Sequence, residues 1–256
     1  MRRILRWTLP AGLALATALV FATGFTLALR GGVGEPVGAD AASYTEAPTP
    51  ASGKPLILIV GDSLARGTGD ASGRGLGGNL DEMLARDGVE PEVVNLAVNG
   101  ARTGDLMEKL ERPNIRDLAG KASAIVVSIG GNDLFGISTR QEGRFTPAPG
   151  DPRESFGEVL DRVETAVRAL REASPEARIY LLGLYDPFAA RGDQVASYVA
   201  AWNSALVDRL GDDPRITVVQ TADLFVGVDR LSADRFHPNQ DAYERIARRI
   251  ADSAGF

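Results

Sequence analysis

The chain has 256 residues, a formal net charge of -6, a single histidine and no cysteine. The lack of cysteine excludes disulfides, thiolate nucleophiles and thiolate metal sites, and one histidine cannot form a histidine-rich zinc site. The acidic balance argues against a nucleic-acid backbone as the main partner. Charged residues at 24% and hydrophobic residues at 44% are typical of a globular protein.

The first 30 residues have the features of a membrane-targeting segment. Arginines near the N-terminus precede an uncharged run, and its part from Thr8 to Leu29 is long enough, as a helix, to cross a bilayer core. Two interpretations stay open: residues 1–30 are a transmembrane signal anchor that remains attached, or a signal peptide that is removed on secretion. The length of the run favours the anchor. The arginines then place the rest of the chain on the extracytoplasmic side of the cell membrane.

Residues 31–54 are rich in Gly, Pro, Ala, Ser and Thr and show no hydrophobic periodicity. This composition predicts a flexible linker. The remaining residues, 55–256, are enough for one domain with a full hydrophobic core. We therefore expect an anchor, a linker and one globular domain, with membrane association only through the N-terminal helix.

The domain alternates between apolar runs typical of buried strands and apolar residues at helical spacing. Strands are expected at residues 55–60, 93–98, 124–129, 179–184 and 216–219, and helices at residues 76–84, 106–110, 156–170, 195–210 and 242–250. This alternation predicts an α/β fold, a three-layer α/β/α sandwich with a five-stranded parallel sheet. Residues 67–78 contain many glycines but no phosphate-binding signature, and we interpret them as a flexible loop.

Four short polar blocks stand next to these elements. They are Gly61-Asp62-Ser63-Leu64 after the first strand, Asn99-Gly100 after the second, Gly130-Gly131-Asn132-Asp133 after the third, and Asp234-Arg235-Phe236-His237-Pro238 before the last helix. The carboxyl ends of parallel strands meet at one edge of the sheet, where ligands bind. We therefore expect the first three blocks to lie together.

The four blocks, in this order, resemble the GDSL or SGNH hydrolase family of serine esterases and lipases. The glycines around Ser63 look closest to those of secreted bacterial, lipase-like members. The resemblance extends from about Pro55 to the C-terminus. It implies the flavodoxin-like fold of the family and the activity of a carboxylic ester hydrolase.

Ser63, His237 and Asp234 are the candidate catalytic residues. A serine hydroxyl needs a neighbouring base to take its proton, and His237 is the only imidazole in the chain. That imidazole needs an acceptor on its other nitrogen. Asp234 is three residues away and is favoured over Asp229 and Asp241.

The resemblance also implies an oxyanion hole. Its donors are expected to be the backbone N–H groups of Ser63 and Gly100 and the side-chain amide of Asn132. Glycine at position 100 lets the backbone approach the oxyanion closely. Asp62 is interpreted as a residue that shapes the turn. We expect neither a metal nor an organic cofactor.

The substrate stays open at this point. A lipase or acylhydrolase would cleave a lipid or another long-chain ester, whereas an O-acetylesterase would act on envelope or extracellular polysaccharide. A non-catalytic envelope-binding module on the same fold is the alternative of a different class. Residues 136–153 form a long segment that either borders the substrate pocket, with Phe135, Phe145 and Phe188 as apolar candidates, or is a plain surface loop. The sequence predicts no oligomeric state.

Overall fold

The computed structural model describes residues 53–135, 140–141, 144–145, 156–188 and 193–254. The expected anchor at residues 1–30, almost all of the linker at residues 31–54 and most of the segment at residues 136–153 lie outside the described residues. Within the described part, no helix has the length and apolar character needed to cross a membrane.

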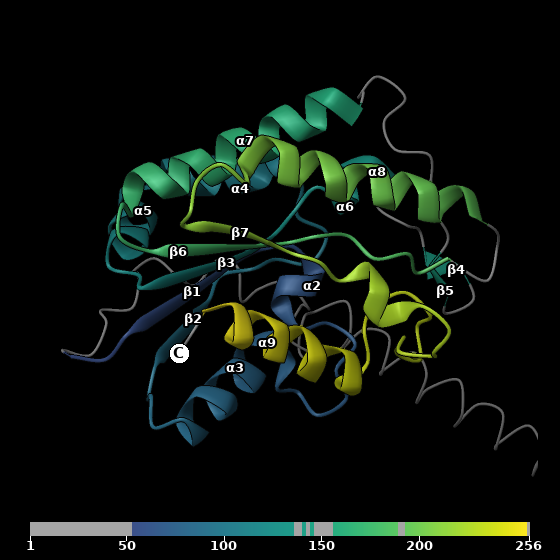
Figure 1. Ribbon diagram of the computed structural model, residues 1–256, viewed down its shortest axis with the longest axis horizontal. Coiled ribbons are helices and arrows are strands. Elements are labelled where there is room, and N and C mark those ends of the chain that lie inside the picture. Colours follow the sequence, from purple (N-terminus) through teal and green to yellow (C-terminus); the bar gives the residue numbers. More distant parts are fainter. Residues whose placement is uncertain (1–52, 136–139, 142–143, 146–155, 189–192, 255–256) are drawn as a thin grey trace, which may run out of the picture. The chain divides into compact units, whose positions relative to one another are not determined.

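A five-stranded parallel sheet lies at the centre of the fold (Figure 1). Its strands are β1 (Leu56–Gly61), β2 (Glu92–Asn95), β3 (Ala124–Ser128), β6 (Arg178–Leu182) and β7 (Ile216–Val219). They lie in the order β2-β1-β3-β6-β7, and every neighbouring pair is parallel. The predicted α/β sandwich with five parallel strands is confirmed. A short antiparallel pair, β4 (Arg140–Gln141) with β5 (Arg144–Phe145), was not expected.

Helices cover both faces of this sheet (Figure 1). One face carries α3 (Gly75–Arg86) and α9 (Gln240–Ala254), and the other carries α4 (Thr103–Glu111), α5 (Pro113–Gly120), α7 (Phe156–Ala173) and α8 (Asp193–Leu210). Three short helices follow strand ends: α2 (Ser63–Arg66), α6 (Gly131–Phe135) and the 3-10 helix η3 (Ala222–Phe225).

The two faces of the sheet bury separate hydrophobic cores because successive strand residues point to opposite sides. In β1, Leu56, Leu58 and Val60 pack into the core beneath α4, α5, α7 and α8. Ile57 and Ile59 pack into the core beneath α3 and α9. Burial of each such side chain contributes about 1.5–3 kcal/mol to folding. A strand buried on both faces therefore reads as the continuous apolar run seen in the sequence.

The second strand is shorter than predicted, and helix α5 was missed. The assigned strand ends at Asn95, although the amides of Leu96 and Val98 still donate to the carbonyls of Ile59 and Gly61 in β1, at 2.8 and 2.9 Å. Helix α5 begins at Pro113, which needs no N–H partner at the first helical position. It is only eight residues long, too short for its apolar spacing to stand out.

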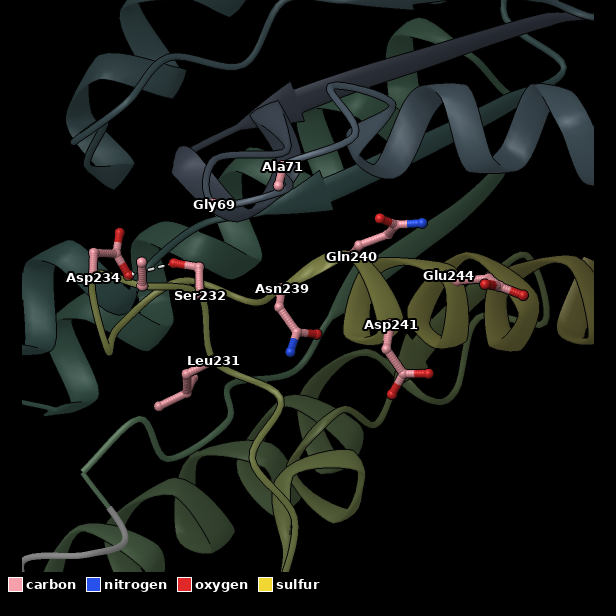
Figure 2. Close-up of a pocket in the computed structure, with 10 residues that line it drawn as sticks. Gly69, Ala71, Leu231, Ser232, Asp234, Asn239, Gln240, Asp241 and Glu244 are labelled. Atoms are coloured by element: carbon pink, nitrogen blue, oxygen red, sulfur yellow. Dashed lines mark hydrogen bonds between the residues drawn. The ribbon is translucent and has the colours of Figure 1, made fainter.

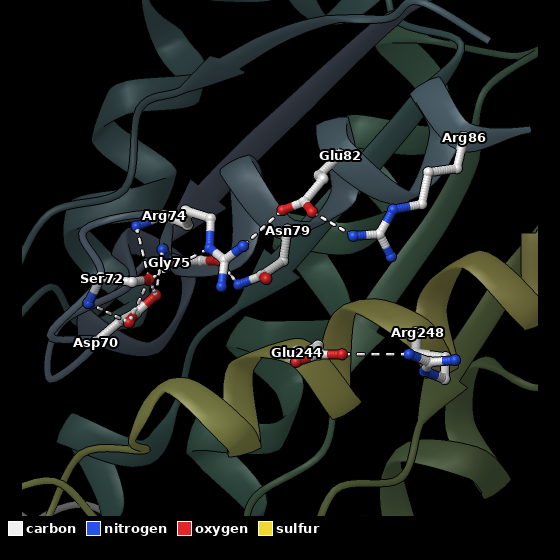
Figure 3. Close-up of polar contacts among 9 residues, drawn as sticks. All are labelled: Asp70, Ser72, Arg74, Gly75, Asn79, Glu82, Arg86, Glu244 and Arg248. Carbon is white, nitrogen blue, oxygen red and sulfur yellow. Dashed lines mark hydrogen bonds and ion pairs between the residues drawn. The ribbon is translucent and has the colours of Figure 1, made fainter. Parts of the chain in front are cut away.

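The glycine-rich stretch is a loop only in part, so the prediction of a loop over residues 67–78 is wrong at its C-terminal end. Helix α3 begins inside it at Gly75. The Asp70 carboxylate accepts hydrogen bonds from the backbone amides of Ser72 and Gly75, both at 2.8 Å (Figure 3). Glycine is required where Gly67 passes Gly75, because a Cβ on Gly67 would lie 2.6 Å from the Gly75 Cα.

The strand order reverses direction at β1, and this places a crevice at its carboxyl end. The chain passes from β1 to β2 on one side and later returns to β3 on the other side. Such a switch point is where open α/β sheets bind ligands. The ends of β1 and β3 stay very close, because the Asp62 amide donates to the Ser128 carbonyl at 2.9 Å.

Candidate active site

Ser63 lies at this switch point, between the end of β1 and the start of α2. Asp62 caps α2, since its carboxylate accepts a hydrogen bond from the Leu64 amide at 3.1 Å. Gly61 has a φ of +125°, and a Cβ there would lie 1.9 Å from the Ser128 carbonyl oxygen. The Gly-Asp-Ser order therefore follows from a close approach at Gly61, a helix cap at Asp62 and a half-buried first helical residue at Ser63.

His237 lies in a loop between η3 and α9 whose two ends are joined by hydrogen bonds. The base of the loop is closed by hydrogen bonds from the Ser232 amide to the His237 carbonyl at 2.7 Å and from the Asn239 amide to the Arg230 carbonyl at 2.8 Å. Inside the loop, Arg235 has a φ of +60°, a left-handed conformation that is uncommon for residues other than glycine. This turn brings the side chains of residues 234 and 237 together.

Asp234 receives four hydrogen bonds. Its Oδ2 lies 2.6 Å from the His237 Nδ1, and its Oδ1 accepts from the Ser232 hydroxyl and from the amides of Phe236 and His237 at 2.7, 3.0 and 2.9 Å. Partial burial alone would raise the pKa of Asp234, but these hydrogen bonds, led by that of His237, hold the pKa well below its usual range. The carboxylate is therefore charged at neutral pH.

The imidazole of His237 connects Asp234 to Ser63. Its Nε2 lies 2.9 Å from the Ser63 Oγ, so serine, imidazole and carboxylate form one hydrogen-bonded chain. The other acids considered from the sequence are engaged elsewhere: Asp229 pairs with Arg235, and Asp241 pairs with arginines at positions 230 and 245. The carboxylate three residues before His237, predicted from its spacing, is therefore the one that contacts the histidine.

Asn132 lies beside this chain of hydrogen bonds, and its side chain contacts the residue that follows Gly100. Asn132 lines the same cavity as Ser63 and His237. Its Nδ2 donates to the Ala101 carbonyl at 2.9 Å, which fixes the amide plane and uses one of the two N–H bonds. Gly100 immediately precedes Ala101 and has a φ of +77°. It does not line the cavity wall, but the Asn132 bond ties its loop to the site.

The cavity next to Ser63 has a volume of about 50 Å³. Its wall contains the apolar residues Leu64, Phe135, Leu184, Tyr185, Pro187 and Phe236. Of the aromatic residues proposed from the sequence, Phe135 lines the cavity, and Phe188 contacts Phe236 with ring centroids 5.8 Å apart. The side chain of Phe145 lies outside the described part. The cavity is therefore a small, largely apolar space in front of the serine.

A second cavity, of about 760 Å³, lies behind the Asp234 loop. Figure 2 shows Gly69 and Ala71 on one side of it and Leu231, Ser232 and Asp234 on another. Neither Ser63 nor His237 lines this space. Although this cavity is the larger of the two, it is therefore not the substrate site of Ser63. Among the residues that the structure describes, no group of three or more His, Cys, Asp or Glu side chains is arranged to hold a metal ion.

Two serines that support the site were missed in the sequence. The Ser128 hydroxyl donates to Asp62 at 2.8 Å, and the Ser232 hydroxyl donates to Asp234 at 2.7 Å. Burial raises the pKa of Asp62 to about 6, against the lowering effect of the Ser128 hydroxyl and of nearby amides. A polar residue at the end of the otherwise apolar β3 run was the signal that could have identified Ser128.

Comparisons with known proteins show the family to which the chain belongs. Residues 59–245 match the model of the GDSL-like lipase/acylhydrolase family. The chain belongs to this family. It is 31% identical to the uncharacterized protein YpmR of Bacillus subtilis. The aligned region covers 76% of this chain and 79% of YpmR. The chain is 26% identical to the spore germination lipase LipC of Bacillus licheniformis. The aligned region covers 65% of this chain and 79% of LipC.

Solved structures show the same fold. The lipase Lip_vut3 from a goat rumen metagenome has a TM-score of 0.62 at 22% identity, with 78% of this chain and 97% of that one covered. The acetylxylan esterase Axe2 of Geobacillus stearothermophilus has a TM-score of 0.57 at 22% identity, with 80% and 96% covered. The family predicted from the four sequence blocks is confirmed. The protein is a carboxylic ester hydrolase of this family.

Proposed function

We propose that Ser63 is the nucleophile of an ester hydrolase, with His237 as its general base and Asp234 as the acid that orients the imidazole. The observation that carries the proposal is the unbroken contact from the Ser63 Oγ through His237 to Asp234, with distances of 2.9 and 2.6 Å. The charge on Asp234 stabilises the imidazolium that forms when the serine loses its proton.

The reaction has two halves. The Ser63 Oγ bonds to the ester carbonyl carbon while its proton passes to the His237 Nε2, and the carbonyl oxygen becomes an oxyanion. When that intermediate collapses, the bond to the alcohol breaks and the alcohol takes the proton from His237. Water then gives a proton to His237 and attacks the acyl-serine. The acid leaves and the Ser63 hydroxyl is restored.

The oxyanion is assigned to the N–H groups of Ser63 and Gly100 and to the second N–H of Asn132. The bond from Asn132 to the Ala101 carbonyl supports this assignment, because it fixes the amide before substrate arrives. Preorganised donors of this kind typically change the rate by about 10²–10³-fold each.

A lipid or other long-chain acyl ester is the first candidate substrate, in keeping with the apolar lining around Phe135, Leu184 and Phe236 and with the lipase LipC as a relative. An acetyl ester of a polysaccharide is the second, favoured by the volume of only about 50 Å³ in front of the serine. A non-catalytic binding module does not account for an intact hydrogen-bonded chain that includes the only histidine.

We further propose that the domain works outside the cytoplasm, held at the cell membrane by residues 1–30 through the linker at residues 31–54. The uncharged run from Thr8 to Leu29 supports this location. Membrane fractionation of cells that express the full chain tests it. Protein in the carbonate-resistant membrane fraction supports an anchor, and protein in the medium supports a cleaved signal peptide.

Hydrolysis of a series of aryl esters, from acetate to laurate, tests the reaction and separates the two substrates. Wild type is expected to hydrolyse at least one of them, and Ser63→Ala is expected to be inactive on all. A sharp preference for acetate supports the acetylesterase, and a preference for longer chains supports the acylhydrolase. If Ser63→Ala were as active as wild type, the assignment of Ser63 as the nucleophile would be contradicted.

A further inference from the structure

A buried carboxylate stands directly beside the proposed oxyanion donor Asn132. Asp133 is only 3% exposed. Its Oδ1 accepts the hydroxyl proton of Thr103 at 2.6 Å, and its Oδ2 accepts the Thr103 amide at 3.0 Å. A buried carboxylate costs free energy unless it is well paired, and here both of its oxygens accept hydrogen bonds from a residue 30 positions away in the chain.

Thr103 is the link between this carboxylate and a third element. It is fully buried at the first position of α4, where its amide has no partner inside the helix. Its hydroxyl donates to Asp133 and accepts from the Arg162 Nε at 2.8 Å. The Arg162 Nη2 also lies 3.6 Å from the Asp133 Oδ1. Arg162, Thr103 and Asp133 thus connect α7, α4 and α6.

The loop that carries Gly100 is consequently attached to the Asn132 segment at two points. Asn132 binds the carbonyl of Ala101, and Asp133 binds the hydroxyl and amide of Thr103. The two oxyanion donors supplied by different loops, the Gly100 amide and the Asn132 side chain, therefore sit on segments whose separation these bonds fix.

We propose that Asp133, Thr103 and Arg162 form a clamp that sets the spacing of the oxyanion donors Gly100 and Asn132. The three are positioning residues, since they touch each other and the donor-bearing segments rather than the reacting atoms. This inference rests on the proposed ester hydrolysis. Small displacements matter here, because a donor stabilises the oxyanion only at about 2.7–3.1 Å from it.

A purely structural ion pair on the same helix provides the matched control. Arg171 of α7 lies 2.9 Å from Asp213, and both side chains are about a quarter exposed. This pair joins α7 to the residues before β7 and contacts neither Asn132 nor the Gly100 loop. Arg171→Gln is expected to lower the melting temperature and to leave kcat within about twofold of wild type.

Kinetics on the best aryl ester test the clamp. Thr103→Val has nearly the same shape but lacks the hydroxyl, and it is expected to lower kcat about 10-fold with KM changed less than about twofold, since the interaction lost acts in the transition state. Asp133→Asn is expected to lower kcat about 10–100-fold. Thr103→Ser keeps the hydroxyl, and its kcat is expected to stay close to that of wild type.

Two further readouts separate positioning from stability. Phenylboronic acid forms a tetrahedral adduct with serine that carries an oxyanion, so its inhibition constant is expected to rise by the same factor as kcat falls. The midpoint of the pH–rate profile is expected to stay at the wild-type value, because the clamp acts on the oxyanion donors and not on the base. A lower melting temperature alone would produce neither pattern.

The clamp is overturned if Thr103→Val and Asp133→Asn lose stability but retain kcat and boronate affinity, or if Arg171→Gln loses as much kcat as they do. If Asp133→Asn does not fold, the isosteric Thr103→Val decides the question. Failure of the proposed function looks different, because wild type itself would then hydrolyse none of the esters and would not bind the boronate.

Discussion

Two turns bring an aspartate to the catalytic edge of the sheet, and they treat its charge in opposite ways. Asp62 and Asp234 both accept a serine hydroxyl and nearby backbone amides. Burial nevertheless raises the pKa of Asp62 to about 6. For Asp234, burial is outweighed by hydrogen bonds that include the His237 imidazole, and the pKa is well below its usual range.

The difference shows that a turn motif does not determine how a carboxylate behaves. Asp62 is 6% exposed beneath the nucleophile and caps a four-residue helix. Asp234 is less buried, has one more kind of donor and faces the histidine. Asp234 thus keeps a permanent charge where an imidazolium has to be stabilised. The carboxylate of Asp62, below the serine, instead accepts hydrogen bonds from the backbone of α2.

The largest expected effect comes from removing the charge that faces the histidine. Asp234→Asn is expected to lower kcat by about 10³–10⁴-fold, because an amide stabilises the imidazolium poorly and favours the wrong tautomer. Steady-state hydrolysis of an aryl ester measures this loss. Asp229→Asn, which removes an exposed acid paired with Arg235, is the control and is expected to stay within about threefold of wild type. Equal losses in the two variants would contradict the assignment of Asp234.

A smaller effect is expected where the glycine-rich loop supports the Asp234 turn. A Cβ on Gly69 would lie 2.7 Å from the His237 Cβ and 2.7 Å from the Pro238 carbonyl oxygen. Gly69→Ala is therefore expected to shift the histidine and to lower kcat about 10–100-fold, as misplacement of a reacting group does.

Gly73→Ala is the matched control for that variant. Gly73 has a φ of +73°, similar to the +97° of Gly69, but a Cβ there would meet nothing within 4 Å. Left-handed strain is expected to cost each variant about 1–2 kcal/mol of stability, and the overlap at position 69 adds a further loss in Gly69→Ala, as measured by urea unfolding. Only Gly69→Ala is expected to lose activity. A similar loss of activity in Gly73→Ala would make the effect one of strain rather than of contact with His237.

The pH dependence of stability, where no effect on kcat is needed, tests the opposite pKa shifts directly. Between the ordinary value of 3.8 and the folded value of about 6, folded Asp62 holds more protons than the unfolded chain. Its contribution to stability therefore falls as the pH rises through this range, by up to ~3 kcal/mol. Asp62→Asn removes that slope, so its stability relative to wild type is expected to improve from pH 4 to pH 7.

Asp234→Asn is expected to show the reverse trend. Since the pKa of folded Asp234 is depressed, its carboxylate stabilises the fold above the ordinary value, and this contribution is lost as the pH falls below that value. The variant is therefore less stable than wild type at neutral pH and approaches it in acid. Urea unfolding of both variants and wild type from about pH 2 to about pH 7 measures both slopes, that of Asp62 above pH 3.8 and that of Asp234 below it. Parallel slopes would contradict the contrast between the two turns.

Much of the fold and of the candidate site could be predicted from sequence because burial leaves a plain pattern. A strand such as β1, covered on both faces, is a continuous apolar run, and the polar blocks that follow such runs mark one edge of the sheet. Asp234 could be selected because it lies only three residues from His237.

The contacts between distant residues could not be predicted in this way. The bonds from Ser128 to Asp62 and from Thr103 to Asp133 join residues 66 and 30 positions apart, and nothing in a single sequence pairs them. The glycine stretch was misjudged for a similar reason. Its glycines allow close approaches, such as that of Gly67 to Gly75, which are visible only once the chain is folded.

Covalent labelling tests the central claim, that Ser63 is activated by His237, most directly. A fluorophosphonate probe reacts with a serine that has a neighbouring base and an oxyanion hole. Wild type is expected to be labelled at a single site, with the adduct mapped to Ser63 by peptide mass spectrometry, and Ser63→Ala is expected to remain unlabelled. An unlabelled wild type, or an adduct that persists in Ser63→Ala, would contradict the account.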